Sequence, residues 1–190
     1  RDFNKAFSLA ERLITKKSIS KYPRIRIENA LIKIAGNQTK IPQSEILESG
    51  IYPVVTQEAD RLISGYSNNL HPIDDLPLIV FGDHNCTFKF VDFKFVRGAD
   101  GTQLLKPDSS ILEPECFYYL IQNIQIQNRE KYERHYKYLS QNFITIPPTE
   151  IQQSIVRECK EVDNTVNQAQ QNIQEAKSEM EKKVENTFDK

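Results

Sequence analysis

The histidines and cysteines of this 190-residue chain are few and scattered, which argues against a catalytic or metal site. A nucleophilic site needs a base beside its nucleophile, and no Gly-x-Ser-x-Gly elbow, phosphate-binding loop or dinucleotide glycine motif accompanies His71, His84 or His135. The cluster His84-Asn85-Cys86 has no second ligand pair at the spacing of a structural zinc site. We therefore predict no catalytic residue, no metal and no cofactor on this chain.

Polar residues in several turn-like segments instead carry groups that suit DNA recognition. Asn and Gln side chains pair bidentately with adenine, and Arg or Lys side chains pair with guanine. Taken one at a time, each segment is more often an ordinary solvated turn than a DNA contact. The predicted DNA-contacting residues are Asn37, Gln38, Thr39, Lys40, Thr56, Gln57, Arg61, Asn68, His84, Asn85, Arg97 and Thr102.

The net charge of −1 conceals an uneven distribution along the chain. Residues 1–40 hold ten Lys and Arg against three acids, whereas residues 41–148 hold nine against fourteen and residues 149–190 six against nine. The basic block suits a phosphate-binding surface, although a solvated surface has the same composition. A basic and aromatic segment at 131–138 is open to the same two interpretations.

The middle of the chain has the pattern of a small mixed sheet. Short runs of alternating or apolar residues predict strands at 24–27, 51–55, 78–82, 87–90, 92–95 and 103–106, with a loop over 56–69. Pro53 predicts an edge position for its strand, Val91 a bulge or turn, and 116–126 a helix. The predicted fold class is α+β. A basic lead-in occupies 1–21, a small mixed α/β domain 22–147, and a long helix 148–190.

The last segment predicts a coiled-coil helix. Thr149 and Gln152 have the spacing of a capping box, and apolar residues then recur in alternating steps of four and three without Gly or Pro. Such a narrow apolar stripe on a long helix predicts pairing with another helix, and docking on its own domain is the alternative. The predicted pairing residues are Ile155, Cys159, Val162, Val166, Ala169, Ile173, Ala176 and Met180.

The order of these segments resembles a known family. The matching pieces are Gly50–Val55, Leu78–Gly82, Leu104–Pro107, Tyr118–Leu120 and, most diagnostic, the Pro-Pro…Glu…Gln-Gln…Ile-Val run within Ile144–Val156. Together they resemble the DNA specificity subunit of Type I restriction–modification enzymes, with one target recognition domain followed by one conserved helical region. The resemblance covers residues 22 to about 185.

This resemblance implies a non-catalytic module that reads one half of a split double-stranded DNA target. Its implied partners are DNA methyltransferase subunits that methylate adenine N6, a restriction subunit, and a second copy or half-subunit through the helix. S-adenosylmethionine, Mg²⁺ and ATP are expected on those partner subunits. With no apolar run of about 18 residues for a membrane span and no secretory pattern, the implied location is a bacterial or archaeal cytoplasm, where thiols stay reduced.

Specificity subunits of this family have two recognition domains and two helical regions, whereas this chain has one of each. It is therefore either a half-subunit that dimerises through 155–184 or the recognition part of a longer fused chain. The second alternative is favoured because the first residue is Arg1 and not Met. A coiled-coil interaction module without DNA binding is the competing hypothesis.

Overall fold

The computed structural model describes residues 22–36, 39–99, 101–127, 131 and 133–188. They form short strands, two 3-10 helices and three α-helices. The strands are β1 Arg24–Arg26, β2 Lys40–Ile41, β3 Tyr52–Val55, β4 Gly65–Ser67, β5 Leu78–Gly82, β6 Phe88–Val91, β7 Val96–Gly98, β8 Thr102–Leu105 and β9 Phe143–Thr145. The helices are η2 Ile27–Ala30, η3 Gln43–Glu45, α2 Pro114–Ile121, α3 Tyr136–Leu139 and α4 Thr149–Phe188.

The strands form three small sheets. One is antiparallel in the order β6-β5-β8, one is mixed in the order β2-β7-β3-β4, and β1 pairs with β9 in a two-stranded ribbon. This arrangement, followed by a long helix, confirms the predicted α+β class.

The apolar run of β5 is buried on both faces because it separates two hydrophobic cores. Ile79 and Phe81 pack in one core, which includes residues of α2 and α4. Leu78 and Val80 pack in the other core, with Val55 among its members. A strand enclosed on both sides carries continuous apolar residues, as the sequence of β5 predicts.

The start of α2 is fixed by a carboxylate. The Glu113 side chain accepts hydrogen bonds from the main-chain nitrogens of Glu115 (3.1 Å) and Cys116 (2.6 Å), and Pro114 occupies the first turn. The helix therefore begins at Pro114 and ends at Ile121, both earlier than the predicted span 116–126.

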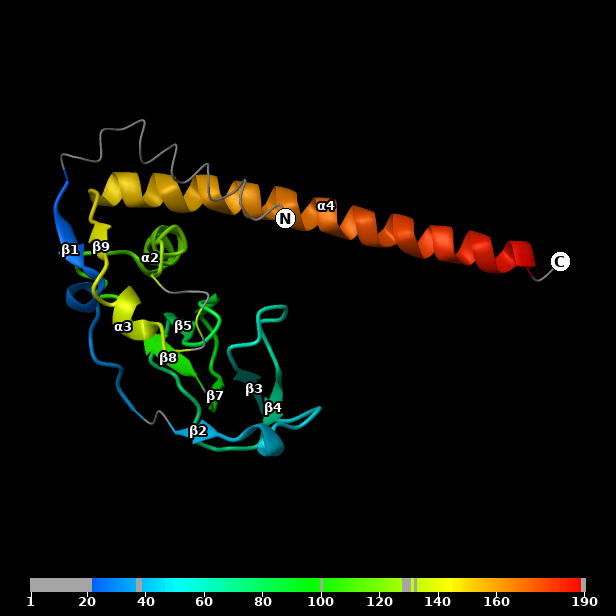
Figure 1. Ribbon diagram of the computed structural model, residues 1–190, viewed down its shortest axis with the longest axis horizontal. Coiled ribbons are helices and arrows are strands. Elements are labelled where there is room, and N and C mark those ends of the chain that lie inside the picture. The colour runs from blue at the N-terminus through cyan, green and yellow to red at the C-terminus, as the bar shows by residue number, and fades with distance from the viewer. Residues whose placement is uncertain (1–21, 37–38, 100, 128–130, 132, 189–190) are drawn as a thin grey trace.

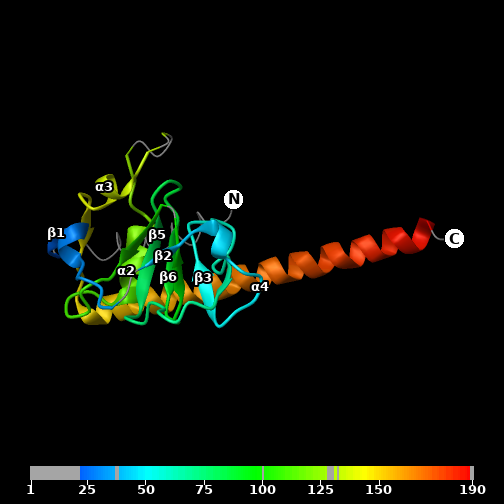
Figure 2. The same ribbon diagram turned by 90° about the horizontal axis from the view of Figure 1, so that it is seen from below.

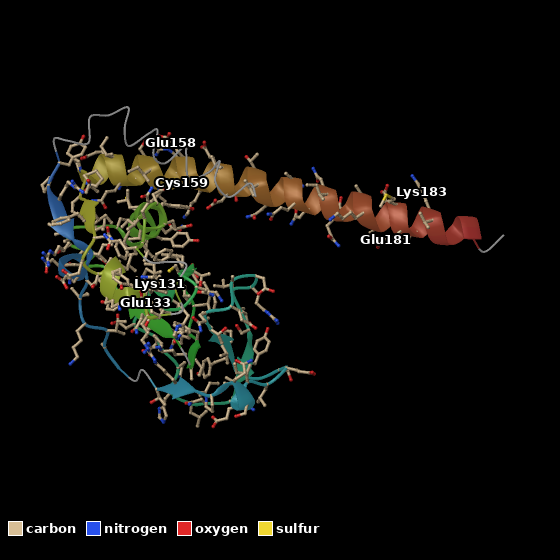
Figure 3. All side chains as sticks on the ribbon, in the orientation of Figure 1. Lys131, Glu133, Glu158, Cys159, Glu181 and Lys183 are labelled. Carbon is tan, nitrogen blue, oxygen red and sulfur yellow. The ribbon has the colours of Figure 1, made fainter. Side chains whose placement is uncertain are left out.

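The first turns of α4 pack on α2, and the rest extends beyond the domain (Figures 1 and 2). Ile155 and Cys159 are only 3% and 4% exposed and belong to the same core as α2. Figure 3 shows Cys159 on the side of α4 that faces the domain. Burial raises the pKa of the Cys159 thiol to about 11, so this cysteine is a packing residue rather than a reactive thiolate.

Gln152 does not complete the predicted capping box. Its side-chain nitrogen donates to the carbonyls of Ile111 (3.0 Å) and Pro147 (2.8 Å), and its side-chain oxygen accepts from the main-chain nitrogen of Glu113 (2.7 Å). This buried amide thus bonds the start of α4 to the segment leading into α2. The first turn of α4 closes on the carbonyl of Pro148.

Three other predictions differ from the structure. The predicted loop 56–69 contains β4, which pairs with β3. As a result β3 is an interior strand and not the predicted edge strand. Only Val54 and Val55 pair with β7, so the missing N–H of Pro53 disrupts no hydrogen bond between β3 and β7. Val91 ends β6 within the ladder, and the break in register falls at 92–94.

A part-buried ion pair ties β8 to the segment before β5. Lys106 Nζ lies 2.7 Å from Asp75 Oδ1, and the Lys106 side chain is 9% exposed. Asp75 also accepts a hydrogen bond from the main-chain nitrogen of Ala35 at 2.8 Å. The Lys106 bond, and then the Ala35 bond, hold the pKa of Asp75 below its ordinary value.

We expect Asp75→Asn to lower the free energy of unfolding by about 1–3 kcal/mol at pH 7. Because the folded state lowers the pKa of Asp75, its stabilisation is present above the unfolded value of about 3.9 and is lost as pH falls through the folded value. Urea unfolding at pH 7 and at lower pH will therefore show a shallower loss on acidification for this variant. Asp74→Asn, at an exposed neighbouring carboxylate, is the control and should match the wild type. Equal effects of the two variants would contradict this account.

Candidate nucleic-acid interface

Three loops that are far apart in the sequence meet at Gln57. The Gln57 carbonyl accepts hydrogen bonds from the Asn85 side-chain nitrogen (2.5 Å) and from Thr87 Oγ1 (3.2 Å). The Gln57 side-chain oxygen accepts from the main-chain nitrogen of His84 at 3.3 Å. Gly101, on the third loop, lies close to the side chains of Gln57 and His84. We call residues 56–58, 83–87 and 101–103 the loop cluster.

Two glycines make this approach possible. A Cβ on Gly82 would lie 2.1 Å from Asn85 Oδ1, and one on Gly101 would lie 2.5 Å from His84 Cδ2. Gly101 also has a φ of +64°, which L side chains rarely adopt. Both positions therefore favour glycine, because a side chain at either would displace residues of the loop cluster.

Asp83 joins the loop cluster to the basic and aromatic segment before α3. Its carboxylate is 1% exposed and accepts hydrogen bonds from the main-chain nitrogen of Tyr136 (2.7 Å) and from the Gln103 side chain (3.0 Å). Arg134 lies 3.7 Å from the same carboxylate and is largely exposed. The role of Asp83 was missed by the sequence analysis, and its one local signal is its place directly after a buried strand.

The structure brings together five of the predicted DNA-contacting residues in the loop cluster, namely Thr56, Gln57, His84, Asn85 and Thr102. Gln57 and His84 are partly exposed and Asn85 is exposed, so their side chains lie at the surface of the loop cluster. Thr102, by contrast, is fully buried.

Arg97 is also buried, at 7% exposure, and its polar groups are used internally. Its Nε donates to Thr102 Oγ1 at 3.1 Å, and a terminal guanidinium nitrogen donates to the Thr102 carbonyl. Burial lowers the pKa of the guanidinium. These two predicted contacts thus brace the turn between β7 and β8 beneath the loop cluster.

Thr56 lies at the buried edge of the loop cluster, and the predicted contacts outside the cluster are spread over the domain. Thr56 is 4% exposed and bonds Ser64 Oγ at 2.6 Å, while Asn68 is exposed and accepts from the main-chain nitrogen of Ile51 at 3.2 Å. Arg61 is exposed and pairs with Glu58. Thr39 and Lys40 are exposed, with Lys40 opposite Arg97 in the β2–β7 register. Asn37 and Gln38 lie outside the described residues.

The predicted pairing stripe of α4 divides into two parts. Ile155 and Cys159 are covered by the chain's own domain and are not accessible to a second helix, contrary to the prediction. Towards the end of the helix the stripe is exposed, at 56% for Ile173 and 62% for Met180. Val184, which was not among the predicted pairing residues, is 50% exposed. Val162 and Val166 are partly buried, and Ala169 and Ala176 are exposed.

Within the described residues, no group of three or more His, Cys, Asp or Glu side chains is placed to hold a metal ion. None of the helices in that part of the chain has the length and apolar character that crossing a bilayer requires.

The family model described as Type I restriction modification DNA specificity domain matches residues 29–178, which include the domain and most of α4. The chain belongs to this family. A search of curated proteins gave no match. The match to the family model confirms the resemblance found in the sequence.

Solved structures show the same fold for this specificity domain. The S subunit of a Type I restriction-modification system from M. genitalium matches with a TM-score of 0.61, 17% identity, and coverage of 90% of this chain and 48% of that one. The HsdS subunit from Thermoanaerobacter tengcongensis matches with a TM-score of 0.54 and 16% identity, over 89% of this chain and 47% of that one. A chain from a structure described as showing complex assembly and conformational transition of the type I R-M system matches with a TM-score of 0.56 and 17% identity, over 94% of this chain and 50% of that one. The chain thus spans about half the length of these proteins.

We expect Asp83→Asn to lower the free energy of unfolding by about 1–3 kcal/mol, because an amide nitrogen would then face one of the donors now bound to a buried carboxylate. Urea unfolding measures the loss, and amide hydrogen exchange should show faster exchange at the nitrogen of Tyr136. Asp92→Asn, at an exposed acid in the same part of the chain, is the control. Unchanged exchange at Tyr136 would show that Asp83 does not hold the two segments together.

Proposed function

We propose that this specificity domain is a non-catalytic module that recognises one half of a split DNA target for a Type I restriction–modification complex. The observation that carries this proposal is the family match, which extends through both the domain and its long helix. The methyltransferase and restriction chemistry, with S-adenosylmethionine, Mg²⁺ and ATP, then belongs to partner subunits.

The loop cluster supports the recognition role. It presents the side chains of Gln57, His84 and Asn85 on loops whose main chain is held by Asp83 and by close glycine contacts. Amide and imidazole groups can donate to and accept from base edges in the major groove. Arg134 and Lys40 lie on exposed flanking segments and supply positive charge for DNA phosphates.

The exposed half of α4 supports a pairing role. At about 1.5 Å per residue the 40-residue helix is about 60 Å long, whereas the eight residues of α2 span about 12 Å. The domain can therefore cover only the first turns of the stripe. The remaining apolar residues fit a second helix from another copy or half-subunit, which would carry a second recognition domain.

We expect the chain to bind duplex DNA with an affinity that falls steeply as salt rises, since phosphate contacts dominate such binding. Arg61→Ala, if Arg61 contacts a base, should weaken binding to the preferred sequence by about 1–3 kcal/mol and relax one position of the motif. Lys94→Ala is the matched control, because Lys94 is also exposed and ion-paired. Fluorescence anisotropy with a selected duplex library measures both effects.

A uniform loss across all sequences would make Arg61 a phosphate contact instead. Absence of DNA binding by the chain assembled with methyltransferase subunits would contradict the proposed function and favour an interaction module.

We expect Ile173→Glu with Met180→Glu to reduce the mass of the self-associated chain toward that of a monomer. Burying a large aliphatic side chain stabilises by about 1.5–3 kcal/mol, and a carboxylate at that position reverses this gain. Sedimentation equilibrium measures the mass. Gln171→Glu, on the opposite face of the helix, is the control. An unchanged mass in the double variant would show that the stripe does not pair copies of this chain.

A further inference from the structure

Lys89 is a buried lysine without a partner. The residue is 8% exposed, and its Nζ is inaccessible and has no hydrogen-bond partner among the described residues. It lies on β6, opposite Val80 of β5, on the strand face that also buries Val91. An ammonium group buried without a compensating partner costs stability, so its position calls for a role other than folding.

The loop after β3 lies beside this part of β6, because Thr87 Oγ1, two residues before Lys89, donates to the Gln57 carbonyl at 3.2 Å. Burial lowers the pKa of Lys89, while the nearby carboxylates of Glu58 and Asp60 favour its charged form and Arg61 opposes it. Glu58 in turn pairs with Arg61 at 3.2 Å. The Glu58 carboxylate is thus paired with one cation and favours the charge of a second, as a phosphate group bound there would.

Hydrogen bonds close the base of this loop, whereas its tip is exposed. Thr56 Oγ1 bonds Ser64 Oγ at 2.6 Å, and the Ser64 main-chain nitrogen donates to the Val54 carbonyl at 2.8 Å, which closes the base. Residues 59–63 have no regular structure and are exposed. The base adjoins Gln57, so the tip lies next to the loop cluster.

We propose that Lys89 forms a DNA-phosphate site that the nearby Glu58 carboxylate screens in the free protein. This inference rests on the proposed function. When a DNA phosphate displaces the Glu58 carboxylate, the loop tip shifts, Arg61 is released from its ion pair, and Lys89 gains the anionic partner that it lacks. Glu58 therefore acts as an internal competitor that weakens binding to DNA backbone.

The test uses the full chain, a 30-base-pair duplex of mixed sequence and a salt series. We expect Lys89→Met to weaken binding about tenfold and to reduce the slope of log affinity against log salt by about 0.9, the value for one phosphate. Glu58→Gln should strengthen binding by about threefold to tenfold because it removes the competitor. The controls are Lys94→Met and Glu45→Gln, exposed residues whose loss changes net charge equally. Inorganic phosphate at matched ionic strength should not reproduce the effect of the duplex.

Thermal unfolding separates this role from a structural one. Lys89→Met should unfold at or above the wild-type temperature, since it removes an unpaired buried charge. A lower unfolding temperature would make Lys89 a structural ion-pair partner of Glu58 and overturn the inference. If the wild type binds the duplex while Lys89→Met and Lys94→Met bind alike, this inference fails and the proposed function stands. If the wild type does not bind the duplex even with methyltransferase subunits, both fail.

Discussion

The docking of α4 on α2 is the contact on which the architecture depends. Ile155 and Cys159 bury the start of the apolar stripe in the domain core, and Gln152 is held by three hydrogen bonds across the junction. Two further contacts extend it, from Tyr119 to Asp163 at 2.7 Å and from Lys160 to Glu115 at 2.6 Å. With both apolar and polar contacts in place, the helix continues the domain as a rigid rod. A second domain carried by a paired helix would then stand at a defined distance and orientation.

The same hydrophobic core also connects the junction of α2 and α4 to the loop cluster. The core that holds Ile155 includes Ile79 and Phe81 of β5, and β5 leads directly into Gly82 and the buried carboxylate of Asp83. The loops that present polar side chains are thus attached to the same packed unit as the helix. By comparison, hydrogen bonds close the Glu58–Arg61 loop at its base, so a displacement of its exposed tip would leave the frame in place.

Local patterns in the sequence predicted the parts of the fold that local physics determines. A continuous apolar run suffices to identify β5, and the alternating steps of four and three identify α4. Partners distant in sequence decided the rest. Gln152 bonds Glu113 and Ile111 instead of capping its own helix, and the predicted loop 56–69 forms β4 only because β3 is beside it. For the site, residue type selected candidate side chains, but only the fold shows that Arg97 and Thr102 bond each other.

Two acids of residues 41–148 are engaged within the domain, so they add to the negative charge of that segment while bonding to other groups of the domain. Asp83 is buried and surrounded by donors, and Asp75 is paired with Lys106, so these carboxylates serve the interior of the domain. Each of them also orients a cation or an amide, as with Arg134 beside Asp83. Net charge sums over such internal pairs and therefore understates the positive character of an exposed segment. Beside Asp83, the charged group that a phosphate would meet at the surface is the exposed side chain of Arg134.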